Sequence, residues 1–418
     1  MKIIFLNQHF PPEVGAPQIR VYEVSKELMS RGHQVEVLTA FPHHPMGVIP
    51  EGYRGRFYMK EEYDGISVHR SWIYPSPKGS FWKRLMSYFS FTFSSFYSLA
   101  VSKKADVIIC TSPPLFLGIT GYVGSLFKRA KFVFNVADIW PESAVKLGLV
   151  KNKQFIALAE WLEMFLYKRS WKMAGATEGI SAYMGEKSGR PHDSFMLPNG
   201  VNTDTFAPLE PDQELMDELN LHGKKVFAYT GTMGYAQGLD SILLVAEKVR
   251  DELPNVHFLF IGDGQEKEML LSMKEEKKLH NVTFKDSVPV AMMPKVFSIS
   301  DYSIVPLKNL EIFKGARPSK IFPALSTGTP VLYCGEGEAA ELISSNACGA
   351  VAEPENVEAI AQQVRYLAEL SEAEYRTLSE NGRDFVIREY SWKRIVDDLL
   401  ENIKDASSER EREAGSRG

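Results

Sequence analysis

Two cations, Arg317 and Lys320, stand just ahead of a short apolar run in a segment with the pattern of a loop, a short helix and a buried strand. The segment, residues 315–332, reads Gly-Ala-Arg-Pro-Ser-Lys-Ile-Phe-Pro-Ala-Leu-Ser-Thr-Gly-Thr-Pro-Val-Leu. A helix start presents unpaired backbone N–H groups and the positive end of a dipole, so cations beside it favour an anion, most plausibly phosphate. Pro323 is expected in the first helical turn, where it removes no interior hydrogen bond.

Three further turns follow predicted strands in the same half of the chain. They are Gly231-Thr-Met-Gly-Tyr-Ala-Gln-Gly, Gly262-Asp-Gly-Gln-Glu and Asp286-Ser-Val-Pro. Glycine lets backbone amides approach a phosphate closely, although glycine-rich turns also serve packing alone. Together with Arg317 and Lys320, the three turns predict a nucleotide or phosphate site at one edge of a sheet.

Short apolar strands alternate with helix-length segments along the whole chain, which predicts parallel sheets covered on both faces. In the first half the expected strands are 2–6, 35–39, 106–110, 131–136 and 172–177. In the second half they are 226–230, 256–261, 282–284, 302–305, 330–333 and 349–352. The fold class is therefore α/β, with two doubly wound Rossmann-like domains whose strand ends face a central cleft.

A turn cluster at residues 197–202 separates the two halves. The predicted domains are 1–198, 199–390, a closing helix at 391–404 and a disordered tail at 405–418, which lacks large apolar residues. A length of 418 residues fits two domains of ordinary size.

Net charge, cysteine content and the N-terminal sequence indicate which ligands and which cellular compartment to expect. A formal net charge of −5 gives no global electrostatic reason to expect nucleic acid. Three widely spaced cysteines have no metal-ligand spacing, and an odd number makes a disulfide framework unfavourable. The apolar start of the chain is too short and too quickly polar for a signal peptide. We therefore expect a cytoplasmic protein.

Several motifs, in this order along the chain, resemble those of the retaining glycosyltransferases of family 4, which have the two-domain GT-B fold. The motifs are Pro11-Pro-Glu-Val-Gly, Arg31-Gly-His-Gln-Val, Asp138-Ile-Trp-Pro-Glu, Pro198-Asn-Gly-Val-Asn, Gly231-Thr-Met-Gly-Tyr-Ala-Gln-Gly, Gly262-Asp-Gly and Thr327-Gly-Thr-Pro-Val. The segments Phe41-Pro-His-His-Pro-Met-Gly and Asp138-Ile-Trp-Pro-Glu are most similar to the branch that transfers N-acetylated aminosugars, such as N-acetylfucosamine, in bacterial surface polysaccharide assembly.

The resemblance implies transfer of a sugar from a nucleoside-diphosphate sugar, with retention at the anomeric carbon and with neither metal nor cofactor. We expect the donor to be UDP-linked. The first domain would hold a polyprenyl-diphosphate-linked or saccharide acceptor, and the second the donor. A leaving diphosphate oxygen takes the acceptor proton in such enzymes, so the protein mainly stabilises phosphate charge. The resemblance places donor contacts at Gly15, Ala16, Gly231, Thr232, Gln237, Gly262, Val288, Lys314, Gly315 and Ala316.

The chain departs from the family at charged positions. Two glutamates that contact the donor sugar and the ribose in the family align with Gly315 and Pro323, and Glu311 can replace the first only if the loop is rearranged. The diphosphate-binding Arg and Lys of the family align with Thr232 and Gln237. We therefore expect Lys320, together with Arg317, to carry the diphosphate and to act as the catalytic cations.

In the first domain, Asp138 is expected to be catalytic or to orient the substrate, with a helix N-cap as the alternative. Glu142 is a candidate acceptor contact or part of a solvated helix face. Arg20 is a candidate for an acceptor phosphate or an exposed helix residue. The adjacent His43 and His44 have no carboxylate or third imidazole at ligand spacing, so neither they nor His9 predicts a metal site.

The aromatic segment 81–101, flanked by Lys83, Arg84, Lys103 and Lys104, is interrupted by too many serines to span a bilayer. It is expected either at the inner face of the plasma membrane as a peripheral contact or as a buried helix. Two alternatives to a transferase stay open at this point. One is a catalytically silent nucleotide-sugar-binding or scaffold protein, and the other is a hydrolysing UDP-N-acetylglucosamine 2-epimerase, which shares the two-domain architecture.

Overall fold

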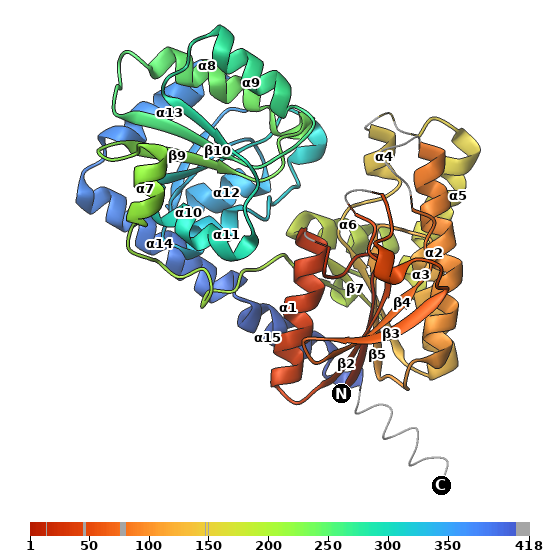
Figure 1. Ribbon diagram of the computed structural model, residues 1–418. Coiled ribbons are helices and arrows are strands. Elements are labelled where there is room, and N and C mark those ends of the chain that lie inside the picture. Colours follow the sequence, from red (N-terminus) through yellow and green to blue (C-terminus); the bar gives the residue numbers. More distant parts are fainter. Residues whose placement is uncertain (14, 45–46, 76–80, 147, 149, 407–418) are drawn as a thin grey trace. The chain divides into compact units, whose positions relative to one another are not determined.

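The computed structural model describes residues 1–13, 15–44, 47–75, 81–146, 148 and 150–406. Its contacts divide the chain into two compact units (Figure 1). Unit 1 comprises Met1–Asn199 together with the segment that begins at Ile395, and unit 2 comprises Gly200–Arg394. The first boundary lies one residue beyond the position expected from the turn cluster.

Unit 1 is an α/β domain in which helices connect most of the strands. Its strands are β1 (Lys2–Leu6), β2 (Gln34–Ala40), β3 (Tyr58–Tyr63), β4 (Ile66–Ser71), β5 (Val107–Ser112), β6 (Lys131–Val136), β7 (Lys172–Gly175) and β8 (Ser194–Met196). Its helices are α1 (Ala16–Ser30), α2 (Phe81–Val101), α3 (Leu117–Lys128), α4 (Glu142–Lys146), α5 (Lys153–Arg169), α6 (Glu178–Ser188) and α15 (Trp392–Ile403), whose first turn belongs to unit 2.

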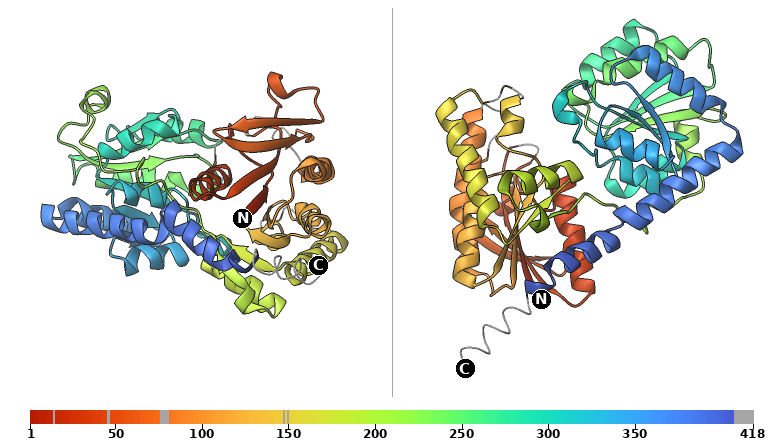
Figure 2. Two further views of the ribbon diagram at one scale, coloured as in Figure 1. Left: turned by 90° about the horizontal axis from the view of Figure 1, so that it is seen from below. Right: turned by 180° about the vertical axis from the view of Figure 1, so that it is seen from behind.

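The eight strands form one sheet in the order β3-β4-β2-β1-β5-β6-β7-β8, and only the β3–β4 pair is antiparallel. Helices α1 and α15 cover one face, whereas α2, α3 and α5 cover the other (Figures 1 and 2). Strand β1 pairs with β2 on one side and β5 on the other, so the winding direction reverses there. In such sheets, ligands bind beyond the strand ends at this switch point.

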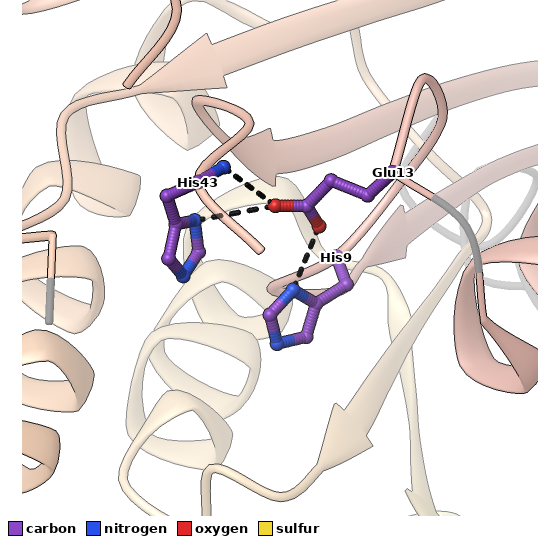
Figure 3. A group of neighbouring side chains, drawn as sticks. All are labelled: His9, Glu13 and His43. Carbon is purple, nitrogen blue, oxygen red and sulfur yellow. Dashed lines mark hydrogen bonds and ion pairs between the residues drawn. The ribbon is translucent and has the colours of Figure 1, made fainter. Parts of the chain in front are cut away.

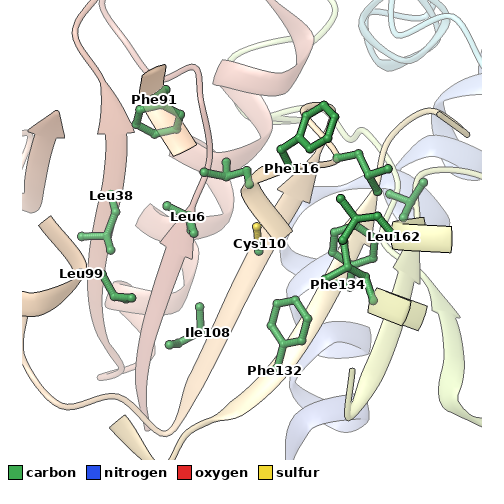
Figure 4. Packing of buried hydrophobic residues seen from close by; sticks show 14 of the residues in the cluster. Leu6, Leu38, Phe91, Leu99, Ile108, Cys110, Phe116, Phe132, Phe134 and Leu162 are labelled. Atoms are coloured by element: carbon green, nitrogen blue, oxygen red, sulfur yellow. The ribbon is translucent and has the colours of Figure 1, made fainter. Parts of the chain in front are cut away.

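The core between the sheet and α2, α3 and α5 is dense in aromatic side chains (Figure 4). Helix α3 packs especially closely because it carries glycine on its inner side. A Cβ atom on Gly121 would lie 2.8 Å from the Cβ of Cys110, and one on Gly124 would lie 2.4 Å from a methyl of Leu99. Larger residues at these positions would force α3 away from its neighbours.

Unit 2 repeats the same architecture with a smaller sheet. Its strands are β9 (Lys225–Thr230), β10 (Val256–Ile261), β11 (Val282–Lys285), β12 (Tyr302–Pro306), β13 (Val331–Cys334) and β14 (Gly349–Ala352). Its helices are α7 (Gln213–Leu219), α8 (Leu239–Val249), α9 (Lys267–Glu276), α10 (Met293–Ser298), α11 (Ile321–Ser326), α12 (Glu338–Ser345), α13 (Val357–Glu369) and α14 (Glu372–Tyr390).

The second sheet is entirely parallel, in the order β11-β10-β9-β12-β13-β14, and its switch point lies between β9 and β12. Helices α8, α9 and α13 contribute to the core on one face, and α11, α12 and α14 to the core on the other. Two doubly wound α/β domains therefore exist, as the alternating pattern predicted. In unit 1 the strands β3, β4 and β8 were missed, because their residues carry no long apolar run.

The closing helix expected at 391–404 is confirmed as α15 (Trp392–Ile403), but its residues are divided between the two units. Helix α14 ends at Tyr390, and α15 follows after Ser391, which forms a parallel bridge with Val201 in unit 2. From Ile395 onward α15 belongs to unit 1, where Asp397 pairs with Arg31 of the turn that ends α1. Residues 407–418, most of the predicted disordered tail, lie outside the described residues.

Candidate functional site

Lys320 lies at the switch point of the second sheet, directly before α11. Its Nζ donates to the Tyr229 hydroxyl at 2.9 Å and lies 4.0 Å from the centre of that ring. Among the described residues, no carboxylate pairs with this ammonium group. Burial lowers the pKa of Lys320 from 10.5 to about 7. An ammonium group held without a counter-ion is a ready partner for an anionic ligand.

The glycine turn after β9 lies against this lysine. A Cβ atom on Gly231 would be 3.1 Å from Lys320 Nζ, and Gly231 has φ +127°. The Tyr229 hydroxyl in turn donates to the carbonyl of Thr232. Lysine, tyrosine and glycine turn thus form one hydrogen-bonded unit with exposed backbone at Gly231 and Thr232. Backbone and cation together can hold a phosphate group.

The other glycine turn has a packing role. A Cβ atom on Gly262 would lie 1.8 Å from the carbonyl oxygen of Gly231, so only glycine allows the two turns to touch. Gln237 accepts a hydrogen bond from the backbone N–H of Gly234 and thereby shapes the first turn. Val288 packs partly buried against the core beside α7 and α10, and Ala316 against the core beside α11. These four positions therefore shape the turns rather than supplying charge.

Arg317 differs from Lys320, because a carboxylate already pairs with it. Its Nε lies 2.7 Å from Glu338 Oε2, and its Nη1 donates to the Tyr390 hydroxyl at 2.6 Å. The charge of Arg317 is thus balanced by a carboxylate, whereas Lys320 hydrogen-bonds to a neutral hydroxyl. The expectation that both carry phosphate charge stays a prediction, and the geometry favours Lys320 for that role.

Glu338, which the sequence did not single out, brings a carboxylate close to Gly315. A Cβ atom on Gly315 would lie 4.0 Å from Glu338 Oε1. Gly337, with φ +80°, permits this approach, because its missing Cβ would lie 1.9 Å from the carbonyl oxygen of Lys314. Glu311 instead pairs with Lys314 at 2.9 Å and has a side chain that is 74% exposed. The carboxylate that fills the space at Gly315 therefore comes from Glu338.

In unit 1, Asp138 follows β6 at the carboxyl edge of the sheet. The helix α4 begins only at Glu142, so the helix N-cap alternative for Asp138 is wrong. Its Oδ2 accepts from the Ser143 hydroxyl at 2.9 Å. The surrounding protein removes water and raises the pKa of Asp138, although hydrogen bonds from Ser143 and the Ile139 backbone oppose this shift. Glu142 pairs with Lys146 at 2.8 Å on the helix surface.

Arg20 is buried in unit 1, and its role toward an acceptor phosphate stays a prediction. It is 2% exposed, its Nη1 donates to the carbonyl oxygen of Leu197 at 3.2 Å, and burial lowers its pKa to about 10. The exposed-helix alternative is therefore wrong. Gly15 and Ala16 lie at the start of α1, where a Cβ on Gly15 would collide with the Gln18 amide at 2.6 Å.

Two turns of unit 1 meet at the carboxylate of Glu13 (Figure 3). Its Oε1 accepts the backbone N–H groups of His43 and His44, each at 2.7 Å, and its Oε2 accepts Nδ1 of His9 at 2.8 Å. Oxygen Oε1 also lies 3.4 Å from Nδ1 of His43. These three side chains form a group with metal-ligand spacing. The expectation that no carboxylate or third imidazole lies near His43 was therefore wrong.

Comparison with known proteins assigns the class. Residues 15–200 match the family "Glycosyl transferase 4-like domain", and residues 212–385 match "Glycosyl transferases group 1". The chain is 27% identical over 383 residues to the putative colanic acid biosynthesis glycosyl transferase WcaI of Escherichia coli, covering 87% of this chain and 91% of that protein. It is 25% identical to the probable glycosyltransferase WbjE of Pseudomonas aeruginosa, covering 69% and 72% of the two chains.

A solved structure of similar fold is HepE from Anabaena in complex with UDP-glucose. The TM-score is 0.71 and the identity 16%, with 97% of this chain and 100% of that chain covered. Two Rossmann-like domains, each with polar turns at the carboxyl edge of its sheet, give the GT-B fold, and the two family matches identify the chain as a glycosyltransferase. The chain belongs to the group 1, family 4-like glycosyltransferases.

Proposed function

We propose that this chain transfers a sugar from a UDP-linked donor, with retention at the anomeric carbon and without a metal, in the assembly of a bacterial surface polysaccharide. The acceptor is lipid-linked through a polyprenyl diphosphate or is a saccharide, and the sugar is an N-acetylaminosugar. The name of WcaI supports a biosynthetic role, the name of WbjE supports glycosyl transfer, and the UDP-glucose complex of HepE supports the base. The motifs at residues 41–47 and 138–142 support the sugar type.

The observation that carries the proposal is the Lys320 ammonium group beside the Gly231 turn, for which the described part of the chain supplies no carboxylate partner. A nucleoside diphosphate leaves as an anion, and a desolvated cation stabilises that charge more strongly than water does. A leaving phosphate oxygen accepts the proton of the acceptor hydroxyl on the same face, so the chain needs no protein base. Glu338 contacts the donor sugar in place of the carboxylate missing at Gly315, and Asp138 orients the acceptor.

The proposal is tested by measuring nucleotide release from a panel of UDP- and GDP-linked sugars, with and without EDTA. We expect UDP release from a UDP-N-acetylaminosugar, unaffected by EDTA, and an axial anomeric product wherever the donor is axial. Nucleotide binding without turnover of any donor would favour a silent binding protein. Release of a free 2-epimer would favour the hydrolysing epimerase, and inversion at the anomeric carbon would contradict retention.

Peripheral membrane contact is part of the proposal, and α2 with the end of α3 supports it. Large apolar side chains on these helices are exposed to solvent, and we call them the apolar face: Trp82, Met86, Phe93, Tyr97, Val101, Leu126 and Phe127. Between Gly65 and Ala137 the sequence holds nine Lys and Arg residues against one acidic residue, Asp106. Lys83 and Arg84, beside Trp82 in the first turn of α2, are exposed. An apolar surface with positive charge beside it suits anionic lipid headgroups. Among the helices that the structure describes, none is long and apolar enough to cross a bilayer.

Replacing Phe93 and Phe127 by serine is expected to weaken flotation with liposomes that contain anionic lipid. These side chains are 72% and 84% exposed, so their loss removes apolar contact with lipid while leaving the core intact. We expect the partition coefficient to fall by about a hundredfold or more, because burial of each phenylalanine contributes roughly 1.5–3 kcal/mol. Leu209→Ser, at an exposed leucine of unit 2, is the matched control. Absence of flotation of the unmodified protein would contradict membrane contact.

A further inference from the structure

The carboxylate of Glu13 accepts hydrogen bonds from His9 and from the backbone of His43 and His44, and these contacts fix where the hydrogens lie. Burial alone would raise the pKa of Glu13, but the hydrogen bonds from His9 and from the backbone N–H of His43 lower it to about 2. Glu13 is therefore an anion at neutral pH, and each group facing it must donate. Its three close partners are the Nδ1–H of His9 and the backbone N–H groups of His43 and His44.

These contacts fix which ring nitrogen of each histidine carries the proton. Nδ1 of His9 faces the carboxylate and must hold a hydrogen. Nδ1 of His43 lies 3.0 Å from the carbonyl oxygen of Phe41, which can only accept, so that nitrogen also holds a hydrogen. Burial lowers the pKa of His43 and favours its neutral ring. The remaining nitrogen of each ring is Nε2, and Figure 3 shows both pointing away from Glu13. In a neutral ring this nitrogen is a lone-pair acceptor.

The position of His9 makes it the ligand-facing member of the pair. It follows β1, the strand beside the switch point of the first sheet, where ligands bind in such folds. Its side chain is 26% exposed, whereas that of His43 is 8% exposed. Among the residues that the structure describes, none hydrogen-bonds to Nε2 of His9. The turn is also held in place, since the buried Arg70 donates to the carbonyl oxygen of Pro11.

The chemistry of this site selects a hydroxyl group over a phosphate group. A neutral imidazole nitrogen with a buried carboxylate behind it accepts a hydrogen bond and repels an anion. The same arrangement disfavours a metal at Glu13, because the ring nitrogens that face the carboxylate carry hydrogens. Sugar hydroxyls are donors of the required kind. The reaction requires that one hydroxyl of the acceptor points in a fixed direction. A lone pair on Nε2 of His9, held in one orientation, can fix that direction.

We propose that Nε2 of His9 accepts a hydrogen bond from a hydroxyl of the saccharide acceptor and that Glu13 is the positioning residue that fixes the His9 tautomer. This inference rests on the proposed function, because it names the group that unit 1 recognises in the acceptor. His9 holds the hydroxyl and does not take its proton. The histidine-rich turn is therefore a sugar site and not a metal or phosphate site.

The test follows the ring ¹⁵N signals of His9 while the whole protein is titrated with methyl glycosides of glucose, galactose and N-acetylglucosamine, and separately with inorganic phosphate. We expect the free protein to show the Nδ1–H tautomer and at least one glycoside to shift Nε2 of His9, with no response to phosphate. Glu13→Gln presents an amide donor to Nδ1, so it should invert the tautomer and weaken glycoside binding about tenfold. His9→Phe should abolish binding, His9→Gln should retain part of it, and His192→Phe on the surface of unit 1 should not change it.

Three outcomes would overturn the inference: no response of His9 to any glycoside, a response to phosphate instead, or stoichiometric Zn²⁺ that shifts His9 and His43 together. Nucleotide release without added acceptor separates this inference from the proposed function. Release of UDP with an unresponsive His9 leaves the function standing and removes the site. Glycoside binding at His9 with no nucleotide release from any donor leaves the site standing and removes the function.

Discussion

Lys320→Met is expected to lower the affinity for an intact UDP-sugar by about 30- to 150-fold, equivalent to the roughly 2–3 kcal/mol of a hydrogen bond to a charged partner. Methionine keeps most of the side-chain volume over the Tyr229 ring while removing the charge that has no carboxylate partner among the described residues. Isothermal titration calorimetry with UDP-N-acetylglucosamine measures the effect. Lys295→Met is the matched control, because that lysine is half-exposed and already pairs with Asp212 at 2.8 Å.

A second measurement separates loss of charge from loss of structure. Lys320→Arg keeps a cation and should retain part of the affinity, whereas a merely structural lysine would tolerate methionine as well as arginine or better. Unchanged donor affinity in Lys320→Met, with an unchanged melting temperature, would show that another group carries the diphosphate. Arg317 would then be the next candidate, once released from Glu338.

Donor affinity of the unmodified protein is expected to fall as the pH rises above 7. Burial places the pKa of the free Lys320 at about 7, and a bound diphosphate favours the ammonium form and raises that pKa. Between the two pKa values the association constant therefore falls up to about tenfold per pH unit, with uptake of close to one proton per donor at pH 8. Calorimetry in buffers of different ionisation enthalpy measures the uptake. Lys320→Arg should remove it, since arginine stays charged.

The same shift has the opposite sign for the stability of the free protein. The unfolded lysine keeps its ordinary pKa of 10.5, so it binds more protons than the folded one between about pH 7 and that value. The Lys320 contribution to the free energy of unfolding should therefore become more favourable as the pH rises through this window. A rise in pH therefore weakens donor binding while it stabilises the free protein. Both effects are expected of a buried lysine whose charged form is stabilised by an anionic ligand.

Local sequence signals predicted the framework of unit 2 but not its charge arrangement. All six strands of its sheet carry apolar runs, so the pattern located them, and the glycine turns after β9 and β10 followed. The pairing of Arg317 with Glu338 joins side chains 21 positions apart in the chain, on two turns that meet only in the folded sheet. No spacing rule distinguishes an arginine that is neutralised by such a partner from a lysine that is not.

The same reason explains the missed cluster in unit 1. His9 and Glu13 stand four residues apart, and His43 lies 30 residues beyond Glu13. Parallel pairing of β1 with β2 brings their turns to one edge, with Leu6 opposite Leu38. The sequence placed both turns at the correct edge, but the hydrogen bonds of Glu13 to the His43 and His44 backbone depend on turn conformation, which the residue pattern does not encode. Asp138 was located correctly after β6, whereas the start of α4 was predicted too early.

Glu338→Gln is expected to lower kcat/KM for the donor about 30-fold, because the amide cannot replace a charged hydrogen-bond acceptor for sugar hydroxyls. The matched control is Glu311→Gln, since Glu311 is 74% exposed in an ion pair with Lys314, and exposed pairs contribute little. Steady-state kinetics with varied donor, at fixed acceptor, measures both variants. Equal effects of the two changes would contradict the assignment.

The decisive test places a new carboxylate at position 315 in a protein that lacks the carboxylate of Glu338. A glutamate introduced by Gly315→Glu would start 4.0 Å from Oε1 of Glu338, and apart from its two chain neighbours no other described residue comes that close to its Cβ. In the single variant Gly315→Glu, where Glu338 is still present, the two carboxylates would repel one another and lower activity. In the Glu338→Gln background the new carboxylate should restore much of the lost kcat/KM, because the donor sugar needs a carboxylate in that space and not a particular residue. Failure of this rescue, in a variant with an unchanged melting temperature, would assign Glu338 to the support of Arg317 alone.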